Sequence, residues 1–163
     1  MMRAASGLPF SGAGIGLLAP GVLSRSNAPA SVTGTTSNTV VTTDTIPAGT
    51  LKVGDLLESF GIVSKTGTGT VILRVQLSDG TNAVQFVGTT SGSGAVQLQA
   101  GNRFALLATK SQSSISVGTP FSSGTTAAST LDESKAWTVQ WSLQQSVPSD
   151  TSTLVFRNTT LTR

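Results

Sequence analysis

The acidic residues are the first candidates for chemistry in this sequence, because its 163 residues contain neither histidine nor cysteine. Histidine is the usual base of serine and cysteine triads, and both residue types are the usual ligands of zinc and haem iron. We therefore expect no such triad and no zinc or haem site. The acids that remain are Asp44, Asp55, Glu58, Asp79, Asp132, Glu133 and Asp150.

Two pairs of these acids are close enough in the chain to suggest a glycosidase, which needs two carboxylates roughly 5–10 Å apart across a cleft. The pairs are Asp55 with Glu58 and Asp132 with Glu133. Asp55 and Asp79, however, lie in glycine-containing turns, where the carboxylate typically accepts backbone hydrogen bonds. The adjacent Asp132 and Glu133 are typical of a solvated loop. The sequence therefore predicts no catalytic dyad, and we expect that the protein is not an enzyme.

Binding of metals, nucleotides and nucleic acids is not expected either. No loop has the spaced Asp and Asn ligands of a calcium site, and the glycine-rich stretch 88–94 lacks the lysine and the helix of a phosphate-binding loop. The ten basic residues are scattered along the chain and are not interleaved with aromatic residues, which disfavours a nucleic-acid surface. The sequence thus predicts no cofactor and no nucleic-acid partner.

The elements that must position these residues are predicted to be β-strands. Two stretches, 70–78 and 137–143, alternate cleanly between apolar and polar residues, as a half-buried strand does. Trp137 and Trp141 share the apolar face of the second stretch. Two exposed tryptophans at this spacing would form a sugar-stacking platform, but a face that also carries valine and leucine favours the core.

Further short strands are expected between turn-forming clusters, at 37–46, 56–65, 81–87, 95–99, 103–110, 114–117 and 153–162. Asp79 and Gly80 are the preferred pair for a two-residue hairpin turn. The apolar residues of 56–65 change phase, and a bulge near Gly61 would reconcile them. Eight or nine strands without a helical period predict an all-β fold, an antiparallel jelly-roll-like β-sandwich with an extended N-terminal arm.

The N-terminal arm is predicted for residues 1–35, and the jelly-roll domain for residues 36–163. The first segment is rich in Gly, Ala, Ser and Pro and has no persistent period, so it is either a disordered tail or an arm that docks on a neighbour, which we favour. Its short, interrupted apolar run predicts neither a signal peptide nor a membrane span. The candidate arm anchors are Leu8, Phe10, Ile15, Leu17 and Leu18.

The low charge of the chain bears on its partners. Only 10% of the residues are charged, whereas the surface of a freestanding domain is roughly 25–35% charged. The outward positions of the predicted strands carry Thr, Ser, Gln and Asn instead. Either much of the surface faces other subunits, which we favour, or this is an ordinary threonine-rich extracellular β domain.

Four stretches resemble a group of tailed-bacteriophage virion proteins with a jelly-roll domain. They are TIPAGTLKVGD at 45–55 followed by TVILRVQL at 70–77, and the closing pair AWTVQW at 136–141 and TLVFR at 153–157. The resemblance covers roughly residues 36–163 and marks a scaffold. It implies a trimeric structural protein that serves as a capsid decoration (cement) protein, a head fibre or a tail appendage.

The leading hypothesis is therefore a capsid decoration protein on the exterior of the phage head, whose partners are copies of itself and the major capsid protein or other virion proteins. The alternative is a tail or fibre appendage that binds host surface glycans through a long loop at 118–130. Phe121 is the large anchor of that loop and its candidate recognition residue. A third hypothesis, a glycan depolymerase, is disfavoured by the missing histidine and the sparse acids.

Overall fold

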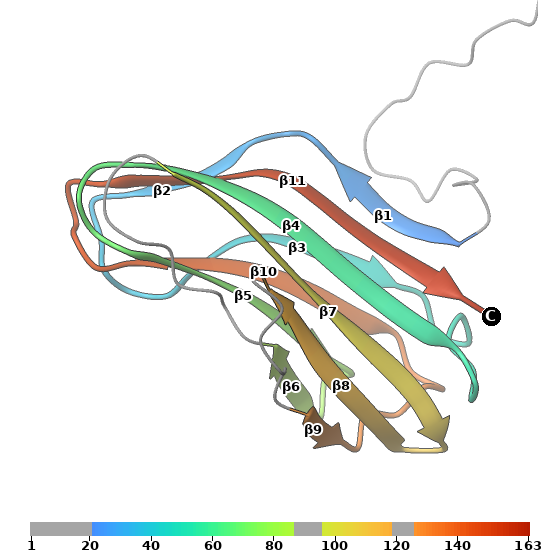
Figure 1. Cartoon of the computed structure of the whole chain (residues 1–163). Helices are drawn as coiled ribbons and strands as arrows, with labels where there is room; N and C mark the ends of the chain where they lie inside the picture. The colour runs from blue at the N-terminus through green and yellow to red at the C-terminus, as the bar shows by residue number, and fades with distance from the viewer. Residues whose placement is uncertain (1–20, 87–95, 119–125) are drawn as a thin grey trace, which may run out of the picture.

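Two antiparallel β-sheets packed face to face form the protein in the computed structural model, which describes residues 21–86, 96–118 and 126–163 (Figure 1). All regular elements in these ranges are strands. The prediction of an all-β sandwich is confirmed. No helix in the described part of the chain has the length and apolar character needed to cross a membrane.

The strands in chain order are β1 (Val22–Ser26), β2 (Ala30–Thr33), β3 (Thr39–Ile46), β4 (Leu56–Thr66), β5 (Val71–Ser78), β6 (Ala83–Phe86), β7 (Val96–Ala108), β8 (Ser111–Gly118), β9 (Thr126–Ser129), β10 (Trp137–Gln145) and β11 (Thr151–Thr162). The larger sheet has the order β1-β11-β4-β7-β8-β9, and β2 also pairs with β11. The smaller sheet has the order β3-β10-β5-β6. From β3 to β5, successive strands therefore alternate between the sheets.

The core lies between the sheets and is built by the strands with the clearest alternation. In β5, every second residue from Val71 to Leu77 is buried, and its neighbours are half-buried. In β10, Trp137 and Trp141 are both 0% exposed. The Trp137 ring meets the Phe104 ring edge-on at 5.7 Å between centroids, a favoured aromatic geometry. The core placement of both tryptophans is confirmed, which removes them as a sugar platform.

The apolar residues of β4 lie on both faces of a strand that has no bulge of its own. Leu57 and Val63 face the core, whereas Phe60 and Ile62 lie on the opposite, outward face. The bulge lies in the partner strand β11, between Leu154 and Phe156. The prediction of a bulge near Gly61 is thus wrong for β4.

A close approach explains the glycine at position 61. A Cβ atom there would lie 2.9 Å from Cζ3 of Trp141, closer than real Cβ atoms approach, and 3.2 Å from Cδ2 of Leu73, which is an unusually tight contact. The absence of a side chain lets the tryptophan ring of the smaller sheet lie directly against the β4 backbone.

The boundary expected at residue 35 differs from the structure. Residues 22–26 and 30–33 form β1 and β2, which pair with β11 in the larger sheet, and Val32 is buried. Without them, one edge of β11 would leave its backbone groups unpaired. Residues 1–20, with all five candidate arm anchors, lie outside the described residues.

Three local predictions also differ. The β5–β6 ladder closes at Ser78 and Ala83, so its turn contains four residues, 79–82, and not two. The strands predicted at 95–99 and 103–110 are one long strand, β7, because continuous pairing with β4 runs through the expected turn. The predicted loop 118–130 contains β9, and its residue Phe121 lies outside the described residues.

Candidate functional site

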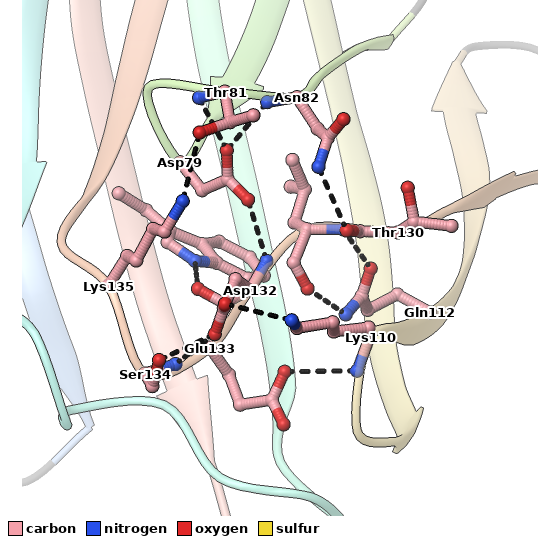
Figure 2. A network of polar contacts seen from close by, with 12 residues as sticks. Asp79, Thr81, Asn82, Lys110, Gln112, Thr130, Asp132, Glu133, Ser134 and Lys135 are labelled. Carbon is pink, nitrogen blue, oxygen red and sulfur yellow. Dashed lines mark hydrogen bonds and ion pairs between the residues drawn. The ribbon is translucent and has the colours of Figure 1, made fainter.

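The densest polar network of the described residues lies at one end of the sandwich (Figure 2). There the β5–β6 turn, the β7–β8 turn and the segment 130–136 between β9 and β10 meet. It contains three of the acids singled out in the sequence, which are Asp79, Asp132 and Glu133. The geometry of these carboxylates decides whether they can act in catalysis or bind a cation.

Asp79 is buried and uses both carboxylate oxygens for backbone groups. Oδ1 accepts hydrogen bonds from the N–H groups of Thr81 at 2.7 Å and Asn82 at 2.6 Å, and Oδ2 accepts one from the N–H of Asp132 at 2.7 Å. Burial by itself raises the pKa of Asp79, but these three donors and the nearby Lys135 charge outweigh it and lower the pKa to about 2. The predicted turn role of this acid is confirmed.

Asp132 and Glu133 both hold the β7–β8 turn. Lys110, at the corner of that turn, has a positive φ of 53°, a conformation that non-glycine residues rarely adopt. Its backbone N–H donates to Oε2 of Glu133 at 3.1 Å, and its Nζ lies 3.2 Å from Oδ2 of Asp132. The hydroxyl and N–H of Ser134, together with Lys110, lower the pKa of Asp132. Both acids are half-buried rather than fully solvated.

Gln112 secures the same end of the sandwich from inside. Its side chain is buried, donates from Nε2 to the carbonyl of Leu131 at 2.7 Å, and accepts at Oε1 from the N–H of Leu131 at 3.0 Å. The hydroxyl of Ser129 also donates to Oε1, which gives the Gln112 side chain three hydrogen bonds. A buried amide with its groups paired stabilises the chain locally.

The opposite end of the sandwich has a second buried cluster. Asp150 accepts hydrogen bonds from the N–H groups of Thr68 at 3.2 Å and Gly69 at 2.7 Å. The fully buried Lys65 donates to the carbonyl of Gly67 at 3.0 Å, and its Nζ lies 4.0 Å from Oδ2 of Asp150. The two clusters thus tie the turns at both ends of the sandwich.

The four acids of the two pairs considered for a glycosidase each contact groups nearby. Asp55 is buried in its turn, where Oδ2 accepts from the N–H of Lys52, whereas Glu58 points out from β4 and pairs with Arg103. Asp132 and Glu133 both bind the turn at Lys110. Among the described residues, no three acids lie close enough together to hold a metal ion. These polar groups position the turns, and the candidate for function is therefore a surface.

Apolar side chains also lie on the outward side of the larger sheet, which we call the outer face. Its apolar residues form two groups: Phe60, Ile62 and Phe156 on β4 and β11, and Leu56 with its partner Ala105 on β4 and β7. The charged pair Glu58 and Arg103 lies between the two groups. Phe60 is 37% exposed, and the other four apolar residues are half-buried. The smaller sheet packs against the opposite side, so the outer face is a candidate interaction surface.

Sequence reasoning missed the outer face, although its signal was present. Leu56, Phe60 and Ile62 share one parity in the strand, out of phase with Leu57 and Val63. Such a strand is apolar on both sides, which indicates a second contact beyond the core. The five arm anchors and Phe121 lie outside the described residues.

No protein-family model matches the chain, and no curated protein matches its sequence significantly.

Proposed function

We propose that this chain is a structural protein of a tailed-bacteriophage virion, a capsid decoration or cement protein that binds the exterior of the head shell as a homotrimer. The observation that carries the proposal is the outer face, where Phe60, Ile62 and Phe156 lie among paired hydroxyl groups and beside the Glu58–Arg103 ion pair. Such a surface is suited to contact with other protein subunits. The polar clusters of the described residues hold turns in place.

The strand order supports the jelly-roll part of this proposal. In the larger sheet β11 lies between β1 and β4, and in the smaller sheet β10 lies between β3 and β5. The last two strands thus insert between early ones in both sheets, as strands do in a jelly roll, and this order supports the proposed topology. The resemblance of residues 36–163 to phage jelly-roll virion proteins rests on the same strands.

The N-terminal segment supplies the capsid contact in this proposal. The described chain begins beside the C-terminal end of β11, where the N–H of Leu161 donates to the carbonyl of Gly21. The preceding twenty residues include Leu8, Phe10, Ile15, Leu17 and Leu18. Contacts of modest strength, repeated by the symmetry of a shell, would sum to firm attachment.

Binding of host glycans by a tail appendage has less support. Trp137 and Trp141 are buried and cannot stack on a sugar ring. The loop residue Phe121, on which that alternative depends, lies outside the described residues.

Electron microscopy of phage particles that carry a gold-labelled copy of the chain tests the proposal. We expect label over the head lattice, and label confined to the tail tip would overturn the decoration role. In the full-length chain, serine at all five arm anchors should abolish attachment to shells that lack the protein, whereas Val40→Ser, on the smaller sheet, should not. Normal decoration of heads by the variant with all five serines would overturn the role of the N-terminal segment in the capsid contact.

A further inference from the structure

We propose that one end of the sandwich, which we call the basic tip, binds an acidic surface of the virion protein to which the N-terminal segment attaches. The basic tip consists of Lys52, Val53, Leu107, Lys110 and Arg163. This inference rests on the proposed function, because it assumes attachment through the N-terminal segment and adds which part of the folded domain contacts the same partner.

The centre of the basic tip is a pair of exposed aliphatic side chains on adjoining backbones. The N–H of Gly54 donates to the carbonyl of Leu106 at 2.8 Å, so Val53 and Leu107, the next residues along each backbone, flank the same hydrogen bond. Val53 is 51% exposed and Leu107 62%, although valine and leucine are mostly buried in proteins. Val53 also occupies the second position of the turn 52–55, where polar residues are usual. An adjacent exposed pair of this kind indicates a contact surface.

Hydrogen bonds hold the turn 52–55 in one shape. The N–H of Asp55 donates to the carbonyl of Lys52 at 3.0 Å, and the N–H of Lys52 donates to Oδ2 of Asp55 at 3.0 Å. The N–H of Leu106 donates to the carbonyl of Asp55, and Leu51, directly before the turn, is buried in the core. A preorganised surface of this kind loses little conformational entropy on binding.

The charges that face outward at the basic tip are mainly positive. In both ion pairs of this end the cation is the exposed member. The side chain of Lys110 is 58% exposed against 18% for Asp132, and that of Arg163 is 60% exposed against 5% for Asp55. Lys52 is exposed, and its side chain has no partner in the described part of the chain. A partner with carboxylates around an apolar recess complements this surface, whereas nucleic acid would call for aromatic residues in place of the aliphatic pair.

The path of the chain indicates which partner that is. The N-terminal segment joins the domain at Gly21, whose carbonyl accepts a hydrogen bond from the N–H of Leu161. Two residues later, Nη2 of Arg163 donates to the carbonyl of Thr50 at 2.9 Å, close to the turn 52–55. The C-terminus and the β7–β8 turn lie at the same end of the sandwich (Figure 1). A protein that holds the N-terminal segment is therefore kept at a high effective concentration beside the basic tip.

Co-sedimentation of the full chain with phage heads that lack the protein tests the inference. We expect Val53→Asp to weaken attachment at least about tenfold, the effect of removing an interface hot spot. The matched control is Val40→Asp, because Val40 is equally exposed, at 51%, but lies toward the opposite end of β3 from the basic tip. It should leave attachment unchanged. Normal attachment of Val53→Asp would overturn the inference.

A charge reversal tests the acidic character of the partner. Lys52→Glu should weaken attachment at low salt, and the difference from the wild type should shrink as salt is added, because exposed charges are screened. Arg25→Glu makes the same change in charge at an exposed position of β1 and should have a smaller effect. Equal losses in the two variants would show that only the net charge matters and would overturn the acidic docking surface.

A steric block keeps the test decisive if Val53→Asp fails to fold. The chain has no cysteine, so a single introduced thiol can be labelled with a bulky maleimide. Labelled Val53→Cys should lose attachment, whereas labelled Val40→Cys should retain it. Normal attachment by the labelled Val53→Cys chain would overturn the inference.

The outcomes separate this inference from the proposed function. Attachment to tails only, lost in Val53→Asp and kept in Val40→Asp, would remove the decoration role and leave the inference standing. Attachment to heads that is the same in Val53→Asp would do the reverse, and a wild type that attaches to no particle would overturn both. Analytical ultracentrifugation covers the remaining occupant: if Val53→Asp loses self-association and keeps attachment, the basic tip binds a second copy and the inference is wrong.

Discussion

Arg157 and Asp44 form a bidentate ion pair that joins the two sheets. Arg157 lies on β11 of the larger sheet and Asp44 on β3 of the smaller one, and each side chain is 14% exposed. Nε of Arg157 lies 3.0 Å from Oδ2 of Asp44, and Nη2 lies 3.2 Å from Oδ1. Nε1 of Trp141 donates to Oδ2 at 3.2 Å. The carboxylate thus has three donors between the two sheets.

Removing one partner of this pair should destabilise the fold strongly. Asp44→Ala leaves the guanidinium of Arg157 largely buried without its counter-charge, and we expect a loss of about 3 kcal/mol in the free energy of unfolding. Arg157→Met combined with Asp44→Leu should cost less than Asp44→Ala alone, because no charge remains buried. Urea unfolding measures both variants. A change below about 0.5 kcal/mol in Asp44→Ala, the range of surface substitutions, would contradict the role of the pair.

Gly61→Ala should destabilise the protein although alanine is a small residue. The new methyl group would meet the rings and methyl groups of Trp141, Leu73 and Leu154 at 2.9 to 3.3 Å, and overpacking of this kind costs roughly 1–3 kcal/mol. Thermal unfolding monitored by tryptophan fluorescence reports the change. Ser64→Ala, on the outward side of the same strand, is the control and should have little effect.

Acid should weaken the end of the sandwich that Asp79 holds. Its pKa is lowered from 3.8 to about 2 in the folded protein, so its contribution is complete above pH 4 and is lost as the pH falls through 2. The contribution is on the order of 1–2 kcal/mol after allowance for solvent screening. Urea midpoints measured between pH 5 and pH 2 should fall less steeply in Asp79→Asn than in the wild type. Parallel curves would show that the carboxylate does not contribute.

Two truncations should separate the part of the N-terminal segment that belongs to the sandwich from the rest. Deleting residues 1–20 retains every described hydrogen bond of β1 and β2, so the unfolding midpoint should stay close to that of the full chain. Deleting residues 1–33 removes both partner strands from the edge of β11 and uncovers the core around Val32. We expect a loss of at least about 3 kcal/mol, and equal midpoints for the two truncations would contradict this.

Local sequence by itself determined most of the strands and the use of the acids. Alternation in 70–78 and 137–143 predicted β5 and β10, and it placed both tryptophans in the core, because side chains of a strand point alternately to opposite faces. Glycine next to Asp55 and Asp79 predicted that their carboxylates bind turns, since this chemistry involves only neighbouring residues.

Only the tertiary structure decided which surfaces meet. Asp44 and Arg157 are 113 residues apart, and nothing local in either strand indicates the other. Alternation in β4 defined two faces, but only the packing of Trp141 against Gly61 showed which face is covered. The strands β1 and β2 looked like part of an arm because their pairing depends on β11, more than a hundred residues later in the chain. Long-range pairing of this kind depends on the partner strand, and a local pattern does not contain it.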